Sequence, residues 1–293
     1  MPKENTHLWF ARRLWKQTRN PSKNAVADHF STDLIQAHPL FFSLGSIIPD
    51  AFFYHPLSRG RRMARVLHGS DPRTRTEAFG RMAAWAQKDD LGRDKAFILG
   101  YLSHVALDRV MHPVVDALSG KRPGQASTGQ SIALHRLVET ALDQQINRCC
   151  RYPRIIWPYP AKRVGVLHRL AAEVGLRRGD VHAALSVQLL VNRLVQGRTA
   201  HALVRALHHP PVLDLSVLLN LCYAQLDREP GFTGPGHDGR EGFWRDFHAV
   251  NWSKLFERAE LEARRLFDLC TEYWANRLDE SGLRRGLPHK PCD

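Results

Sequence analysis

Residues Phe97 to Asp116, with the sequence FILGYLSHVALDRVMHPVVD, set the expectation for the fold of this chain. The run is apolar and compatible with a helix, and it places His104, Asp108 and His112 four residues apart. Positions i, i+4 and i+8 of a helix lie within about 80° of one another, at about 100° per residue. The two imidazoles and the carboxylate would therefore share one face, which is how a helix presents metal ligands.

A second run, HRLVETALD, repeats this spacing with His135 and Glu139 and places Asp143 one turn beyond them. The segment Ser119–Gln130 between the two runs contains Gly, Ser and Pro and would let the chain reverse direction. Pairs of this kind also arise by chance in a helical chain with 16 histidines, where they act as ordinary surface interactions. The apolar residues around the first run favour metal binding instead, because unpaired polar groups are costly to bury.

The rest of the chain is also typical of helices. Helical periodicity bounded by Gly, Pro, Asn or Asp predicts helices over 7–17, 23–37, 73–89, 93–117, 128–149, 161–175, 180–196, 198–208, 211–227 and 252–281. Strand signals are almost absent, so we predict an all-α fold, a multi-helix bundle with a zinc cluster between helices. We expect a helical domain over 1–150 that carries the ligands, and a helical extension over 151–293 packed on it as part of the same globule.

Two further breaks interrupt the helical pattern, at the proline-rich Tyr152–Pro160 and at Glu229–Glu241, EPGFTGPGHDGRE. The second break could cover the site as a lid, and it could equally be a plain surface connection.

The composition excludes several classes of protein. With 43% hydrophobic residues among 293, the chain can fill a substantial core, so general disorder is not expected. No stretch approaches the ~18 apolar residues of a spanning helix, and the start lacks the regions of a secretory signal, so we expect a cytoplasmic protein. The five cysteines include no CxxC pair, which argues against a disulfide framework and a thiolate zinc site. A net charge of +13 implies attraction to polyanions.

Three further ligand candidates lie upstream of the helix pair. His7 follows Thr6, which could cap the start of an amphipathic helix. Asp50 ends the segment SLGSIIPD, where Pro49 suggests that the chain leaves regular structure. His68 precedes a glycine, as at the C-terminal end of a helix. Each residue is weak evidence by itself, because a lone histidine at a helix end is usually a cap or a surface residue.

Together these residues follow the order His, Asp, His, His-x3-Asp-x3-His and His-x3-Glu within the first 139 positions. In this order the sequence resembles the zinc-dependent phospholipase C family, which is structurally related to the single-strand-specific zinc nucleases. The matching segments are THLWFARRL, LGSIIPDAFFYHP, LHGSDP, GYLSHVALDRVMHP and HRLVETALD, over residues 6–143. The resemblance implies an all-α fold and a cofactor of two to three zinc ions.

The resemblance also implies three sets of zinc ligands. The first zinc would take Asp50, His68, His104 and Asp108, the second His112, His135 and Glu139, and the third His7 together with Asp108 as a bridging carboxylate. All of these ligands offer nitrogen or oxygen, which zinc accepts when thiolates are absent. In secreted members of the family a free amino terminus completes the third site, and the spacing equivalent to Asp108–His112 is two residues longer.

The activity implied by the resemblance is hydrolysis of phosphodiester bonds, above all phospholipase C-like release of phospholipid head groups. Asp50 would be the catalytic residue, either binding zinc alone or also orienting the attacking water. The partner would be phospholipid or another phosphodiester, with peripheral contact to an anionic membrane as an option. We interpret His29, His38 and His55 as structural, and Phe52–Tyr54 as core in preference to a pocket wall.

Two alternatives stay open. One is a metal-dependent nuclease or nucleotidase, which the basic charge would suit but which is not favoured. The other is a non-enzymatic helical scaffold with a structural metal site. A His-Asp phosphohydrolase is less favoured still, because its adjacent pair occurs only as His237-Asp238 in a loop rich in Gly and Pro.

Overall fold

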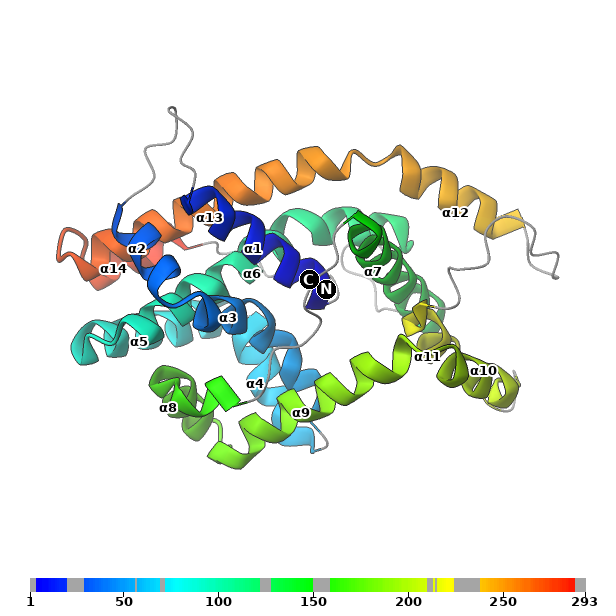
Figure 1. Ribbon diagram of the computed structural model, residues 1–293, viewed down its shortest axis with the longest axis horizontal. Helices are drawn as coiled ribbons and strands as arrows, with labels where there is room; N and C mark the ends of the chain where they lie inside the picture. The colour runs from blue at the N-terminus through cyan, green and yellow to red at the C-terminus, as the bar shows by residue number, and fades with distance from the viewer. Residues whose placement is uncertain are drawn as a thin grey trace.

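The chain folds into an array of helices packed around one long central helix (Figure 1). The computed structural model describes residues 4–19, 29–55, 57–68, 72–121, 128–149, 159–209, 213, 215–223 and 238–287. The first helices are α1 (Glu4–Arg19), α2 (His29–Ala37), α3 (Pro39–Ala51), α4 (Ser58–His68), α5 (Pro72–Asp89), α6 (Gly92–Leu118) and α7 (Gly129–Cys149). They are followed by α8 (Gly165–Glu173), α9 (Arg178–Val195), α10 (Arg198–Leu207), α11 (Ser216–Leu221), α12 (Asp238–Ala249), α13 (Trp252–Trp274) and α14 (Glu280–Gly286). Two short 3₁₀ helices, η1 and η2, span Phe52–Tyr54 and Tyr159–Arg163.

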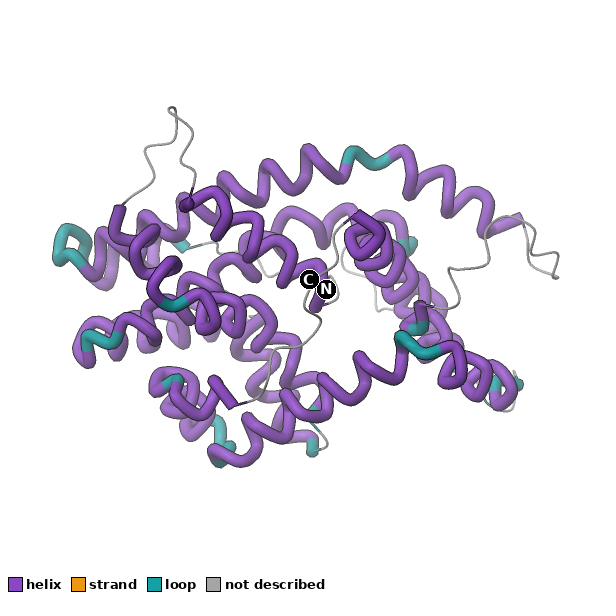
Figure 2. Tube along the Cα trace, viewed as in Figure 1, coloured by secondary structure: helices purple, strands orange, loops and turns teal. Residues whose placement is uncertain are grey.

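The predicted all-α class is confirmed. Within the described ranges there is no β-strand, only an isolated bridge between His209 and Leu213 (Figure 2). None of the described helices is both long and apolar enough to cross a bilayer.

The central helix is α6, and it is buried on nearly all sides. Its residues from Asp94 to Asp108 are all buried, which is typical of a helix enclosed by other helices. It packs against α3 and α13 above all, and also against α1, α2, α5 and α7. Figure 1 shows α13 running along the outside of α6. Because α13 belongs to the last third of the chain, the two predicted regions share this core, while the division near residue 150 stays a prediction.

The backbones of α3 and α6 approach each other more closely than residues with a Cβ atom would permit at the crossing. A Cβ atom added to Gly100 would lie 1.9 Å from the carbonyl oxygen of Phe42, and one added to Gly45 would lie 2.1 Å from that of Phe97. Neither position can therefore hold a larger residue without movement of the backbone. The two glycines bring the backbones of the helices into direct contact, four to five positions before His104 and Asp50.

Several boundaries differ from those predicted. The chain is expected to leave regular structure at Asp50, and α3 continues through Pro49 and ends one residue after the acid, at Ala51. This helix and α4 were missed, because Gly and Pro in the first and the polar, arginine-rich composition of the second weakened the pattern.

In the second half of the chain, the helix predicted over 252–281 ends at Trp274, and a separate α14 follows. Of the helix predicted over 211–227, the structure shows Ser216–Leu221, and part of that range lies outside the described residues. The break predicted at Glu229–Glu241 extends too far at its C-terminal end, because the helix α12 already begins at Asp238. The remainder of that break, with the proposed lid, lies outside the described residues.

Replacing Gly100 by alanine tests the helix crossing. The added Cβ would force α3 and α6 apart, so we expect the free energy of unfolding to fall by about 1–3 kcal/mol. Gly179→Ala is the matched control, because nothing lies within 4 Å of a Cβ added there, in the first turn of α9. Chemical denaturation measures both variants. Equal stability of the two would show that the helices do not approach this closely.

Candidate metal centre

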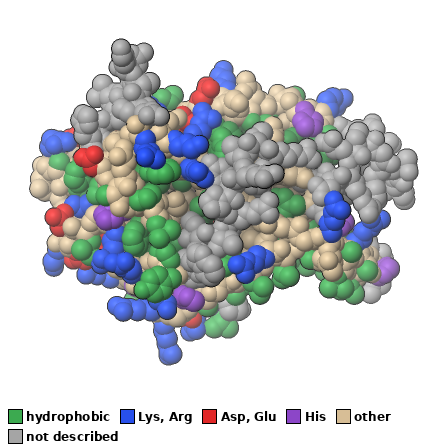
Figure 3. All heavy atoms as spheres, in the orientation of Figure 1, with side chains coloured by type: hydrophobic (Ala, Val, Ile, Leu, Met, Phe, Trp, Pro, Cys, Tyr) green, Lys and Arg blue, Asp and Glu red, His purple; other side chains and the backbone are tan. Residues whose placement is uncertain are grey.

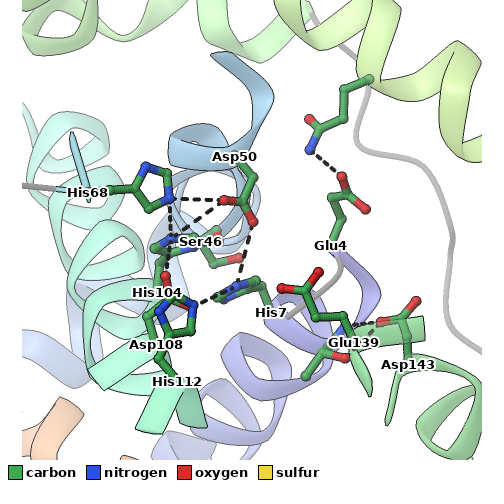
Figure 4. Close-up of polar contacts among 12 residues, drawn as sticks. Glu4, His7, Ser46, Asp50, His68, His104, Asp108, His112, Glu139 and Asp143 are labelled. Carbon is green, nitrogen blue, oxygen red and sulfur yellow. Dashed lines mark hydrogen bonds and ion pairs between the residues drawn. The ribbon is translucent and has the colours of Figure 1, made fainter. Parts of the chain in front are cut away.

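Four helices direct the predicted ligands of the first and third zinc toward one buried position (Figure 4). His7 lies in the first turn of α1, Asp50 in the last turn of α3 and His68 at the end of α4. His104 and Asp108 lie one turn apart on α6. All of these residues are buried except His68, which is partly buried.

Asp50, His68 and His104 form the first group. Nε2 of His68 lies 3.0 Å from Oδ1 of Asp50 and 3.3 Å from Nε2 of His104. Nε2 of His104 is 3.9 Å from the same carboxylate oxygen. One ligand atom from each of these residues thus lies within 4.8 Å of the others.

Backbone carbonyls fix the orientation of both imidazoles in this group. Nδ1–H of His68 donates to the carbonyl of Ala64 at 2.8 Å, and Nδ1–H of His104 donates to the carbonyl of Ser46 at 2.9 Å. Whenever either ring is neutral, its lone pair therefore sits on Nε2, the atom that faces Asp50. This arrangement is typical of histidines that bind a metal, whose second nitrogen donates to a carbonyl or carboxylate.

His7, His104 and Asp108 form the second group. Nε2 of His104 lies 3.1 Å from Oδ2 of Asp108, and Nε2 of His7 lies 3.4 Å from Oδ1 of the same carboxylate. The rings of His7 and His104 are stacked, with centroids 4.0 Å apart. Nε2 of His7 is also 3.7 Å from Oδ2 of Asp50, so the two groups are contiguous.

Charge in this buried position favours a cation. Burial opposes the charge of Asp50, but His104 and the hydrogen bond from His68 outweigh it and lower the pKa of the carboxyl. Burial opposes the charge of Asp108 too, yet His104 and His112 hold its pKa well below the usual range. The two carboxylates overcome the effect of burial on His104 and raise its pKa to about 9.

His7, by contrast, has a lowered pKa because it is buried and lies beside His104. Two buried carboxylates thus lie side by side in this position, and each faces imidazole nitrogens. Divalent zinc with nitrogen and oxygen ligands fits both this charge and these atoms.

The ligands predicted for the second zinc lie beside these groups but are more widely spaced. Nε2 of His112 is 3.8 Å from Oδ1 of Asp108, and its ring centroid is 5.9 Å from that of His135. Nε2 of His135 lies 3.1 Å from Oε1 of Glu139. These three residues are not among the groups whose ligand atoms all lie within 4.8 Å of one another, as far as the described residues go. Burial lowers the pKa of His112 to about 3 and that of His135 to about 4, so both are neutral and able to bind metal.

Sequence reasoning missed Asp116 in this second set. Its Oδ1 lies 3.2 Å from Nδ1 of His135, on the side of the ring opposite Glu139. The signal was present in the sequence, because Asp116 follows His112 by four residues and so continues the polar face of α6.

Asp143 holds the beginning of α1 in place. Its carboxylate accepts hydrogen bonds from the backbone N–H of Thr6 at 2.7 Å, from the hydroxyl of the same residue at 2.7 Å and from the amide of Asn5 at 3.1 Å. The hydroxyl of Tyr223 also donates to it. The prediction that Thr6 is itself the cap was wrong, because α1 begins at Glu4 and a carboxylate from α7 binds its first turn. This contact fixes the position of His7, the next residue.

The remaining predictions concern three histidines interpreted as structural and the aromatic run Phe52–Tyr54. His55 is buried, with Nε2 3.4 Å from Oδ1 of Asp180, away from the metal groups, and His38 packs against Gly92. The prediction that Phe52–Tyr54 is core was wrong for Phe53, which is 45% exposed and whose ring centroid is 5.0 Å from that of His68. The side chain of His29 lies outside the described residues.

A family model described as zinc-dependent phospholipase C matches residues 6–174. The chain belongs to the zinc-dependent phospholipase C family. The match covers more than half of the chain and extends from α1 to the end of α8, so it includes every predicted ligand. No curated protein and no solved structure shows a significant match. Membership of this phospholipase C family supports zinc as the metal for the two groups.

His104→Ala tests whether the two groups bind zinc. Because Nε2 of His104 belongs to both groups, we expect this variant to retain less than half of the zinc of the unsubstituted protein. Elemental analysis of the purified proteins gives the ratio of zinc to chain. The matched control is His248→Ala, an exposed histidine on α12, which should keep its full zinc content. Equal zinc in both variants would place the metal elsewhere.

Asp143→Ala tests the anchor of α1. The substitution leaves the buried N–H of Thr6 without its carboxylate acceptor, so we expect the free energy of unfolding to fall by about 1–3 kcal/mol. Asp246→Ala, at an exposed position of α12, should change it by less than about 0.5 kcal/mol. Thermal or chemical denaturation compares the two. A stable Asp143→Ala protein would show that the first turn of α1 is held by other contacts.

Proposed function

We propose that this protein is a phospholipase C-like phosphodiesterase that uses two to three zinc ions to release phospholipid head groups. The observation that carries the proposal is the convergence of two imidazole Nε2 atoms and a carboxylate oxygen between α3, α4 and α6. Membership of the family supports zinc-dependent hydrolysis of phospholipids in general, and it does not name a particular phospholipid. The number of ions and the substrate are our inference.

In this proposal Asp50, His68 and His104 would hold the first zinc, and Asp108 and His7 would hold another. The two oxygens of Asp108 face imidazole nitrogens, at 3.1 Å from His104 and 3.4 Å from His7, so this carboxylate could serve both. The remaining zinc would be held by His112, His135 and Glu139, with Asp116 orienting the ring of His135.

Zinc bound in these groups lowers the pKa of a water molecule and neutralises charge on the phosphoryl oxygens. The protein's own groups complete the chemistry. One oxygen of Asp50 faces His68, while the other faces His7 at 3.7 Å and is free to accept a proton from the attacking water. The lowered pKa of Asp50 keeps this carboxylate ionised at neutral pH.

The ring of Phe53 marks one edge of the site. It is nearly half exposed and lies beside His68, on the 3₁₀ turn that follows α3. An exposed aromatic ring next to a phosphodiester site suits contact with the apolar portion of a lipid and equally suits stacking on a nucleobase, so it does not discriminate between these two substrates.

The net charge of +13 supports one second candidate, hydrolysis of single-stranded nucleic acid at the same site. One zinc-loaded sample can be assayed for release of the phosphorylated head group from phosphatidylcholine and for cleavage of single-stranded DNA. The proposal expects the first activity to dominate. Dominant cleavage of DNA would establish the alternative, and absence of both activities would favour a structural metal site.

Asp50→Asn tests the catalytic assignment within this assay. The amide keeps the size of the side chain but cannot accept the proton, so we expect head-group release to fall by about 10²-fold or more. Asp246→Asn is the matched exposed control and should retain full activity. Zinc content is measured alongside, in order to separate loss of chemistry from loss of metal. An Asp50→Asn protein with normal activity would remove this residue from the mechanism.

A further inference from the structure

The protein exposes leucines on a projection at one end of the molecule. The projection consists of the end of α9, α10 and α11, which Figure 1 shows at one end of the molecule. From residue 189 to residue 207 no residue is buried. Six leucines of the projection are 47–61% exposed: Leu190, Leu194, Leu203, Leu207, Leu213 and Leu218.

The helix α10 is amphipathic but has no core to cover its apolar face. Its ten residues place Leu203 and Leu207 one turn apart, exposed at 61% and 51%. A helix of this length is marginal in water without tertiary packing. Its apolar face would therefore gain stability from an apolar partner outside the folded chain.

The charged residues around these leucines are mostly basic. Residues 181–213 contain Arg193, Arg198 and Arg205, four histidines and no Asp or Glu, and Asp214 directly follows Leu213. The arginines are themselves exposed, and Figure 3 shows basic and hydrophobic side chains together over this end of the molecule. Exposed leucines flanked by arginines match the composition of helices that lie in the interface of an anionic membrane.

The projection is also hydrogen-bonded to α1 and α7, two helices that carry predicted ligands. On one side Gln188 of α9 donates to Glu4 at 3.0 Å, one turn before His7. On the other side Asn220 of α11 donates to the carbonyl of Ala133 at 2.7 Å and accepts from Thr140 through its own carbonyl at 2.7 Å, which ties it to α7. A partner bound by the projection would therefore lie at a fixed distance and orientation from the metal centre.

We propose that the α9–α11 projection is a docking surface for anionic phospholipid membranes. The leucines enter the apolar part of the interface, and the arginines contact the lipid phosphates. The choice of a membrane over other anionic partners rests on the proposed function, since a phospholipase must reach lipids in a bilayer.

The test is flotation of the zinc-loaded protein with vesicles, before lipid turnover becomes appreciable. Vesicles of phosphatidylcholine with phosphatidylglycerol are compared with vesicles of phosphatidylcholine alone. We expect the protein to bind the anionic vesicles more tightly. The variant Leu203→Gln/Leu207→Gln should bind them at least about tenfold more weakly, because two apolar side chains no longer enter the interface. Leu261→Gln, 66% exposed on α13, is the matched control and should bind like the unsubstituted protein.

Three results would overturn the proposal: no binding of the protein to anionic vesicles, equal binding by the double variant, or a dimer in gel filtration that the double variant abolishes. A separate assay with short-chain phosphatidylcholine dissolved as monomers isolates the chemistry. The double variant should hydrolyse this soluble substrate at the unsubstituted rate. Vesicle binding without hydrolysis of either lipid would contradict the proposed function while leaving the docking surface supported.

Discussion

The contact between Gly45 of α3 and Gly100 of α6 is the constraint on which the metal centre depends. Without side chains at these two positions, the helix backbones touch, and the residues four to five positions later are brought within reach of each other. Asp50 and His104 are those residues, with 3.9 Å between carboxylate and imidazole. The same crossing places the carbonyl of Ser46 where it accepts the hydrogen bond that orients His104. A packing feature thus determines the geometry of the ligands.

The buried charge of the centre explains why a metal suits this arrangement. Carboxylates enclosed by helices cost several kcal/mol each unless cations or hydrogen bonds compensate them. In the described structure the compensation for Asp50 and Asp108 comes mostly from imidazoles, whose protonation is itself opposed by burial. Zinc would supply two positive charges and use the same Nε2 atoms. The site is therefore better suited to binding a metal than to stabilising the protein without one.

The sequence was sufficient to predict the all-α class, and the ligand candidates that it indicated on α1, α3, α4 and α6 lie together in the structure. The signal was strong for α6, because the spacing of His104, Asp108 and His112 coincides with a long apolar run. It was weak for α3, since the glycine that permits the close crossing also resembles a helix breaker. The roles of Asp116 and Asp143 could not be predicted, because each depends on the relative position of two helices that periodicity does not define.

The projection that carries the exposed leucines connects the metal centre to a proposed membrane-binding surface. Its helices were predicted from periodicity, but their exposure was not, because an amphipathic pattern shows which face is apolar and not what covers it. The hydrogen bonds of Gln188 and Asn220 connect this surface to the segments that carry His7 and His135. Membrane contact and phosphodiester chemistry would then belong to one rigid assembly of helices.

Anomalous diffraction from crystals of the purified protein, recorded on both sides of the zinc absorption edge, locates the metal itself. We predict one peak among Asp50, His68 and His104 and a second beside His7 and Asp108. A crystal with zinc bound only at surface histidines, and no peak between α3, α4 and α6, would contradict the metal centre and the hydrolase built on it.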